Sequence, residues 1–388
     1  MGRVSILDFP PRGGAVDRTG AADVSFSLAA AVTAANSVTA TGKPACVYIP
    51  AGIYRIVHAP PPFVRAGCVH GEGSSQSILQ LDRAFSGDLF AWSEAWSATT
   101  PGPTVVGLKI VGDRRAAGQQ NALTFYDRND RVFVDDVEVD DLPGRAIYSG
   151  ATKHVSQAYM RESHLRSLRF FDDGAAGVPV IEFSSQGMGR TDASNEIRLS
   201  QVDIFGSYGP SFVVRNGGEG HVRAITVEAM RIEGLQNGHV PADLITIGDP
   251  KMRGNVNTIS FTDLELIDPY PNFAALRLTA APGAEAPYQI KVTGWIGGGN
   301  PQGQGLRIDA GRSSVFRLSG LHTHDTNVVI GPHVDHILLD GDGRQACWTY
   351  QIDPTSLSGI MTPVLAAGDP SHRRSPAPMT PRHGDQGC

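Results

Sequence analysis

A nine-residue pattern of apolar and polar positions recurs along the middle of the chain. Its first, third, sixth and eighth positions are apolar or small, as in VFVDDVEVD at residues 132–140. The period of two within each half predicts two short β-strands joined by a two-residue bend, with four side chains facing one way and the rest facing outward. Copies of the pattern begin at residues 103, 132, 163, 197, 225, 259, 290 and 316.

A third short apolar run lies between consecutive copies, for example ALTF at 122–125, VIEF at 180–183 and ALRL at 275–278. Three short strands per repeat describe one rung of a parallel β-helix, in which each strand pairs with its equivalent one rung along at ~4.8 Å. A β-sandwich also has many short strands, but they alternate over longer runs without an in-phase repeat. The sequence therefore predicts an all-β parallel β-helix, a solenoid of about 8–11 rungs.

The two ends of the chain differ from its middle. Residues 23–37 (DVSFSLAAAVTAANS) are alanine-rich and predict a short amphipathic helix that caps the first rung. Residues 368–388 are rich in Pro, Arg and Ser and predict a flexible tail. We expect an N-terminal cap segment at 1–45, the β-helix at 46–345, and a C-terminal extension with its tail at 346–388.

Charge and hydropathy exclude two classes of partner. The net charge is −6 and the chain has no Lys/Arg-rich run, which argues against a nucleic-acid partner. No apolar run approaches the ~20 residues of a membrane-spanning helix, so no membrane partner is expected. The N-terminal stretch MGRVSILDF has no apolar signal-peptide core.

The cysteines and histidines predict neither a metal nor a cofactor. The four cysteines lie far apart without CxxC spacing, so a zinc site is not expected. Cys46 and Cys68 sit in apolar strand contexts and are interpreted as buried thiols rather than a disulfide. HTHDTN at 322–327 is interpreted as a chance surface cluster.

A series of short N-terminal motifs accompanies the repeats. They are Asp8-Phe9, Gly14-Ala15, the turn at 17–20, Asp23-Val24-Ser25, VYIPAGIY at 47–54 and GEGSSQSI at 71–78. Together with the repeats, residues from about 8 to 345 resemble the pectate-lyase-like superfamily of right-handed parallel β-helix proteins. The resemblance implies a right-handed helix with an N-terminal capping helix. The superfamily contains polysaccharide lyases, glycoside hydrolases, epimerases and phage tailspike depolymerases.

The same resemblance implies a polysaccharide partner, a homotrimer or a monomer, and a secreted or virion-associated location. It does not extend to the polygalacturonases, because the chain lacks their Asn-Thr-Asp, Gly-Asp-Asp, Gly-His-Gly and Arg-Ile-Lys motifs. By analogy, the substrate trough lies on the third run of each rung. The outward positions expected there are Thr124, Ile147, Glu182, Val213, Thr246, Arg277 and Arg307.

Two carboxylates on this trough suit glycoside hydrolysis. Glu182 and Asp243 lie in rungs two apart, roughly 9.6 Å along the axis, near the upper limit of the ~6.5–9.5 Å that an inverting hydrolase requires. The alternative is that both are solvated acids at strand edges. Asp173 in FFDDGAAG is a further catalytic candidate, or part of an ordinary Asp-Gly turn. Asp135-Asp136 is interpreted as a solvated turn on another face.

A lyase would use different residues of the same region. Tyr208 and His239 can act as the base that removes the proton next to a sugar carboxylate. Arg215, Arg277 and Arg307 can bind the acidic sugar and stabilise the developing charge. The alternative is that these arginines only pair with neighbouring acids.

These observations predict an enzyme that degrades an extended, acidic polysaccharide by hydrolysis or β-elimination. The competing hypothesis is a non-catalytic module that binds glycan, or a structural spike, because the catalytic motifs of the polygalacturonases are missing. The aromatic side chains considered for stacking on sugar rings are Trp92, Trp96, Tyr126, Tyr148, Tyr208 and Tyr270.

Overall fold

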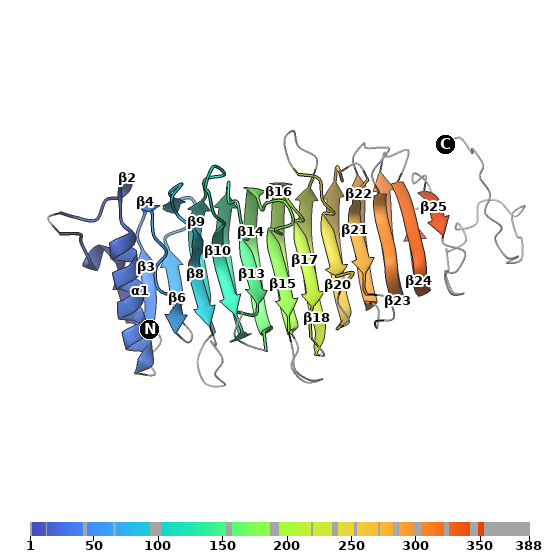
Figure 1. Ribbon diagram of the computed structural model, residues 1–388, viewed down its shortest axis with the longest axis horizontal. Helices are drawn as coiled ribbons and strands as arrows, with labels where there is room; N and C mark the ends of the chain where they lie inside the picture. The colour runs from blue at the N-terminus through green and yellow to red at the C-terminus, as the bar shows by residue number, and fades with distance from the viewer. Residues whose placement is uncertain are drawn as a thin grey trace, which may run out of the picture.

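The protein is an elongated solenoid of parallel β-strands, described here from a computed structural model (Figure 1). The described residues are 2–12, 14–41, 45–64, 67–93, 102–152, 157–186, 194–218, 220–234, 240–251, 254–270, 272–281, 284, 287–297, 304–321, 326–341 and 348–352. Within them, every pairing between strands is parallel, and only two isolated bridges are antiparallel. The predicted all-β parallel β-helix is confirmed.

The third run of each rung forms one sheet along the solenoid, called here the third sheet. Its strands are β5 (Phe63–Val64), β8 (Gly87–Ser93), β10 (Gln120–Tyr126), β13 (Ile147–Gly150), β15 (Ile181–Ser185), β17 (Phe212–Asn216), β19 (Ile245–Gly248), β21 (Ala274–Thr279), the first parts of β23 (Gln304–Leu321) and β24 (Thr326–Gly341), and β25 (Trp348–Ile352).

The nine-residue pattern lies in long, bent strands that make up the rest of each rung. They are β9 (Thr104–Val111), β12 (Phe133–Asp140), β14 (Tyr159–Asp173), β16 (Asn195–Ser207), β18 (His221–Glu233), β20 (Asn255–Ile267) and β22 (Tyr288–Gly297), with the short β11 (Arg128–Asp130) pairing to β14. The predicted copies are in register from 103 to 259, and the copy at 290 is in register in its first half only, because Leu264 aligns with Gly294 rather than with Trp295. The last copy is not in register, because Ile290 aligns with Ser314 and Val292 with Phe316. The copy therefore begins at 314, and its first inward residue is a buried serine.

The bent strands turn at single residues with positive φ. In β14 these are Glu162, Ser167 and Asp172, spaced five residues apart. The left-handed conformation costs an L-residue about 1–2 kcal/mol. We infer that parallel pairing on both sides of each bend offsets this cost. The predicted bend is present, and two further bends define the corners of the rung.

The inward side chains form a continuous apolar core along the axis. Val134, Leu165, Leu199, Val227 and Phe261 align from rung to rung and are all buried. This stacking removes the inward face of every short strand from water, which no single strand could achieve alone. Trp92 and Tyr270, considered as sugar-stacking residues, are fully buried in the fold instead.

The N-terminal end is closed by a helix, α1 (Ser25–Ala40), as predicted from residues 23–37 (Figure 1). It packs against η1 (Ile6–Asp8) and against β1 (Gly2–Ser5) and β3 (Ala45–Ile49). Two N-terminal strands, β2 (Thr19–Asp23) and β4 (Gly52–Ile56), pair with each other. No helix in the described part of the chain is long and apolar enough to cross a membrane.

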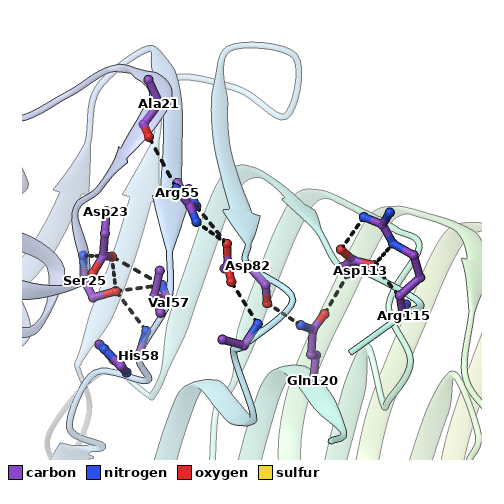
Figure 2. Close-up of polar contacts among 11 residues, drawn as sticks. Ala21, Asp23, Ser25, Arg55, Val57, His58, Asp82, Asp113, Arg115 and Gln120 are labelled. Atoms are coloured by element: carbon purple, nitrogen blue, oxygen red, sulfur yellow. Dashed lines mark hydrogen bonds and ion pairs between the residues drawn. The ribbon is translucent and has the colours of Figure 1, made fainter. Parts of the chain in front are cut away.

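Polar side chains tie the first rungs together at one corner of the solenoid (Figure 2). Arg55 Nη2 lies 2.6 Å from Asp82 Oδ2 on the next rung. Gln120 continues the connection, because its Nε2 donates to the Asp82 carbonyl at 2.8 Å and its Oε1 accepts from the Asp113 N–H at 2.8 Å. The Asp113 carboxylate then pairs with Arg115 at 2.8 Å.

Cys46 and Cys68 form a disulfide, so their interpretation as thiols was wrong. They face each other in paired strands, β3 and β6 (Cys68–Gly71), with their Cα atoms 4.4 Å apart. This spacing lies within the range that a disulfide spans. Strand β7 (Ser77–Leu81) follows β6 after the GEGSSQ loop. On the next rung a single strand, β9, bends at Gly107 and pairs with both β6 and β7.

Candidate functional site

The outward side of the third sheet, called here the third-sheet face, carries one row of aligned side chains. The row runs Thr124, Tyr148, Glu182, Val213, Thr246, Arg277 and Arg307. Six of the seven predicted positions are in it, although Thr124 and Val213 are fully covered there. Ile147 is not, because it aligns with Leu123 and Ile181 and is fully buried, while Tyr148 takes the outward position.

Glu182 is held between two arginines on this face. Arg145 Nε donates to Glu182 Oε2 at 2.6 Å, and Arg215 Nε lies 3.7 Å from Oε1. The Arg145 guanidinium also lies over the Tyr148 ring, 4.7 Å from its centroid. Only 3% of Glu182 is exposed, so this carboxylate is nearly covered by its partners. Removing either partner of such a pair is expected to destabilise the fold, because it leaves a buried charge uncompensated.

Asp249 approaches the same arginine from the other side. Its Oδ2 lies 3.7 Å from Arg215 Nη1. Glu182 and Asp249 therefore flank one guanidinium group. These contacts keep the two carboxylates within about 10 Å of each other, a limit that includes both the ~5–5.5 Å of a retaining and the ~6.5–9.5 Å of an inverting glycosidase. Asp249 is not among the catalytic residues predicted from the sequence, and its partnership with Glu182 through Arg215 was missed.

Asp243 belongs to a neighbouring cluster further along the face. Its Oδ1 accepts from the Ala274 N–H at 2.8 Å, and its Oδ2 lies 3.3 Å from Arg277 Nη1. Arg277 Nη2 and Arg307 Nε each lie 2.8 Å from a carboxylate oxygen of Asp309. The two residues of the predicted pair, Glu182 and Asp243, thus have separate partners.

Two tyrosines lie at the N-terminal side of Glu182. Tyr126 donates from its hydroxyl to Asp88 Oδ2 at 2.9 Å, and its ring meets that of Tyr148 edge-on with centroids 6.0 Å apart. Burial, with Asp88 beside it, raises the pKa of Tyr126. Burial, with Glu182 nearby, raises the pKa of Tyr148. Both hydroxyls therefore stay protonated and act as hydrogen-bond donors.

The other predicted catalytic residues lie elsewhere. Asp173, at the end of β14, is fully buried, and its Oδ1 accepts from the Leu142 N–H at 2.8 Å. Burial raises its pKa well above the usual range. Tyr208 lies before β17 with its ring centroid 3.4 Å from the Arg114 guanidinium carbon. His239 is outside the described residues.

The doublet Asp135-Asp136 is engaged rather than simply solvated. Asp136 Oδ1 accepts from the Ser74 hydroxyl at 2.6 Å and Oδ2 from the Ser74 N–H at 3.1 Å, which anchors the GEGSSQ loop. Asp135 pairs with Arg166 at 2.7 Å. Among the described residues, no group of three or more His, Cys, Asp or Glu side chains is arranged to hold a metal ion.

The fold has counterparts among solved structures. No protein family matches the sequence, and neither does any curated protein. The structure is similar to ORF18 of Geobacillus virus E2, with a TM-score of 0.62 and 11% identity over 88% of this chain and 62% of that one. This chain thus spans less than two thirds of the viral protein.

Weaker similarity extends to two other proteins. One is the A-module of the mannuronan C-5 epimerase AlgE4 of Azotobacter vinelandii, with a TM-score of 0.43 and 16% identity over 94% of this chain and all of that one. The other is the tailspike protein of E. coli bacteriophage HK620, with a TM-score of 0.46 and 13% identity over 92% and 66%. The chain thus has a parallel β-helix fold, as its repeats predicted.

Proposed function

We propose that this protein binds an extended polysaccharide along the third-sheet face and hydrolyses it at Glu182 and Asp249. The observation that carries the proposal is the position of both carboxylates against the single guanidinium of Arg215, each at 3.7 Å. Their separation is compatible with a water molecule between one carboxylate and the sugar, as an inverting hydrolase requires.

The length of the face supports an extended ligand. Side chains of the row repeat once per rung, at ~4.8 Å, a spacing comparable to one sugar unit. The hydroxyls of Tyr126 and Tyr148 lie at the N-terminal part of the face. Guanidinium and carboxylate groups, which hydrogen-bond in fixed directions, follow from Glu182 onward. Few but well-placed polar groups beside aromatic rings are typical of ligand sites.

The balance of charges on the third-sheet face favours neither acidic nor neutral sugars. Arg145, Arg215, Arg277 and Arg307 are balanced by Glu182, Asp249, Asp243 and Asp309, with which they form ion pairs. An acidic glycan therefore stays a prediction from the sequence, and the screen must include both kinds of sugar.

The two carboxylates take different roles in the proposed reaction. Glu182 accepts a proton from water, whose oxygen attacks the anomeric carbon, while Asp249 donates its proton to the glycosidic oxygen that leaves. The Asp249 side chain is 20% exposed, so a bound sugar can reach its carboxyl group. A sugar that draws Arg215 away from its loose contact with Glu182 uncovers Oε1 for the water.

The proposal is tested with purified protein and a panel of acidic and neutral bacterial exopolysaccharides and plant pectins. Viscosity, released reducing ends and the absorbance of unsaturated products are followed together. Glu182→Gln and Asp249→Asn should each abolish shortening, whereas Asp243→Asn and the control Arg231→Gln, on another face, should retain most of it.

Other outcomes point elsewhere. An unsaturated product that persists in both variants would replace hydrolysis with β-elimination. Glycan that binds but never shortens would make the protein a non-catalytic binding module. Far-ultraviolet circular dichroism and thermal unfolding of each variant check that the fold is retained.

A further inference from the structure

A second hollow lies on a different face of the solenoid, formed by the first halves of the bent strands. Its lining residues are Arg131, Glu162, His164, Glu196, Arg198, Ala224 and Thr226. They come from the corner before β12 and from β14, β16 and β18, none of which belongs to the third sheet. The hollow, called here the bent-strand hollow, plays no part in the proposed hydrolysis.

The bent-strand hollow arises from a change in side-chain size between rungs. His164, Arg198, Thr226 and Ser260 align in consecutive strands. The positive-φ residues two positions earlier change in the same way, from Glu162 and Glu196 to Ala224 and Thr258. Long side chains on β14 and β16 therefore form a wall. Short ones on β18 and β20 leave an open floor.

Three charged or ionisable side chains in the wall have no partner among the described residues. Arg131 Nε pairs with Glu162 Oε2 at 3.0 Å. By contrast, no hydrogen bond or ion pair within the described part of the chain engages His164, Glu196 or Arg198, and all three are exposed.

Some outward charges nearby are paired instead. Lys109 pairs with Glu138 at 2.7 Å, and Arg166 with Asp135 at 2.7 Å. What distinguishes the three unpaired groups is that they gather around one hollow. Arg198 and His164 lie one rung apart, and both can donate hydrogen bonds to a ligand. The Glu196 carboxylate beside them can accept hydrogen bonds.

We propose that the bent-strand hollow binds a hexuronate residue of an acidic glycan. The guanidinium of Arg198 takes the sugar carboxylate in a two-pronged contact, with His164 donating from the adjacent rung. Glu196 accepts hydrogen bonds from the sugar hydroxyls. A simple anion can bind Arg198 and His164 but cannot make these contacts with Glu196. The sugar ring lies over the floor of Ala224 and Thr226. This goes beyond the hydrolytic site, because it gives the protein a separate anchoring site for glycan.

Isothermal titration calorimetry with four oligohexuronates (galacturonate, glucuronate, mannuronate and guluronate hexamers) tests this site. Maltohexaose serves as the neutral probe and sodium sulfate as the simple anion. Arg198→Gln should weaken binding of at least one oligohexuronate tenfold or more. Thr226→Trp, which fills the floor, should abolish that binding, and Arg231→Gln, a matched loss of a paired arginine, should leave it unchanged.

Three results would overturn the proposal. These are no oligohexuronate binding by the wild type, equal binding of maltohexaose, or binding of sulfate as tight as that of the hexamer. The third-sheet variant Arg215→Ala separates this inference from the proposed function. If Arg215→Ala alone removes binding and Arg198→Gln does not, the bent-strand hollow is not the site, whereas the third-sheet face remains supported.

Discussion

Arg145 Nε donates a 2.6 Å hydrogen bond to Oε2 of Glu182, joining neighbouring rungs on the third-sheet face. Glu182 is nearly buried, whereas a quarter of the Arg145 side chain is exposed. The pair therefore holds a carboxylate at a fixed point of the third-sheet face. It also orients the Arg145 guanidinium over Tyr148.

Replacing Arg145 by Ala should destabilise the fold. The change leaves the Glu182 charge with only the longer contact to Arg215, and breaking a buried pair costs about 3–5 kcal/mol. Partial exposure of Arg145 reduces the expected loss to about 1–3 kcal/mol. Urea unfolding followed by circular dichroism measures it. The double variant Arg145→Ala with Glu182→Gln should recover part of the loss. If it does not, the ion pair is not the cause.

The buried carboxyl of Asp173 should make stability depend on pH. Burial raises its pKa above the ordinary 3.8, so the folded protein holds this proton more tightly than the unfolded chain does. Its favourable contribution is complete below pH 3.8 and is lost as pH rises through the raised pKa. The free energy of unfolding of Asp173→Asn, relative to the wild type, should therefore increase between pH 4 and pH 7. A constant difference between the two proteins across this range would refute the assignment.

The disulfide between Cys46 and Cys68 should stabilise the N-terminal rungs. It closes a loop across a sequence separation of 22 residues, for which chain entropy predicts about 2–4 kcal/mol. Cys46→Ser with Cys68→Ser should lower the unfolding temperature, and reducing agent should lower that of the wild type alone. A wild-type protein whose unfolding is unchanged by reduction would contradict a structural role for the bond.

Arg114 should hold the corner where Tyr208 lies. Its guanidinium stacks on the Tyr208 ring and donates to the carbonyl groups of Asp172 and Gly174. Arg114→Ala removes these contacts and should cost about 1–3 kcal/mol. Arg114→Lys should recover only part of this, because an ammonium cannot reproduce the planar stack. Equal stability of the lysine variant and the wild type would show that charge alone suffices.

The sequence predicted the fold well because its signal is periodic. Most inward columns, such as the one through Val134 and Leu165, are apolar from rung to rung, so the strands align by pattern alone. The pattern fails where a polar residue enters the core. Ser314 takes an inward position, and the apparent repeat therefore shifts to Phe316. Ile147 was assigned outward because AIY is too short to show which way its alternation runs.

The site was harder to predict, because its contacts depend on how strands end rather than on their period. Glu182 could be found from alternation within VIEF. Arg145 and Asp249 lie just outside their strands, and the corner geometry decides which way they point. The cysteine pair was missed for a related reason. Cys46 and Cys68 are 22 residues apart, closer than later repeats, so their alignment could not be read from the regular spacing.

The measurement that tests the central claim most directly is the anomeric configuration of the first product, followed by proton NMR on a glycan that the wild type shortens. The proposed roles, with Glu182 activating water and Asp249 protonating the leaving oxygen, predict an inverted configuration with no unsaturated sugar. Retention of configuration, an unsaturated product or the absence of any shortened glycan would contradict the proposed hydrolysis on the third-sheet face.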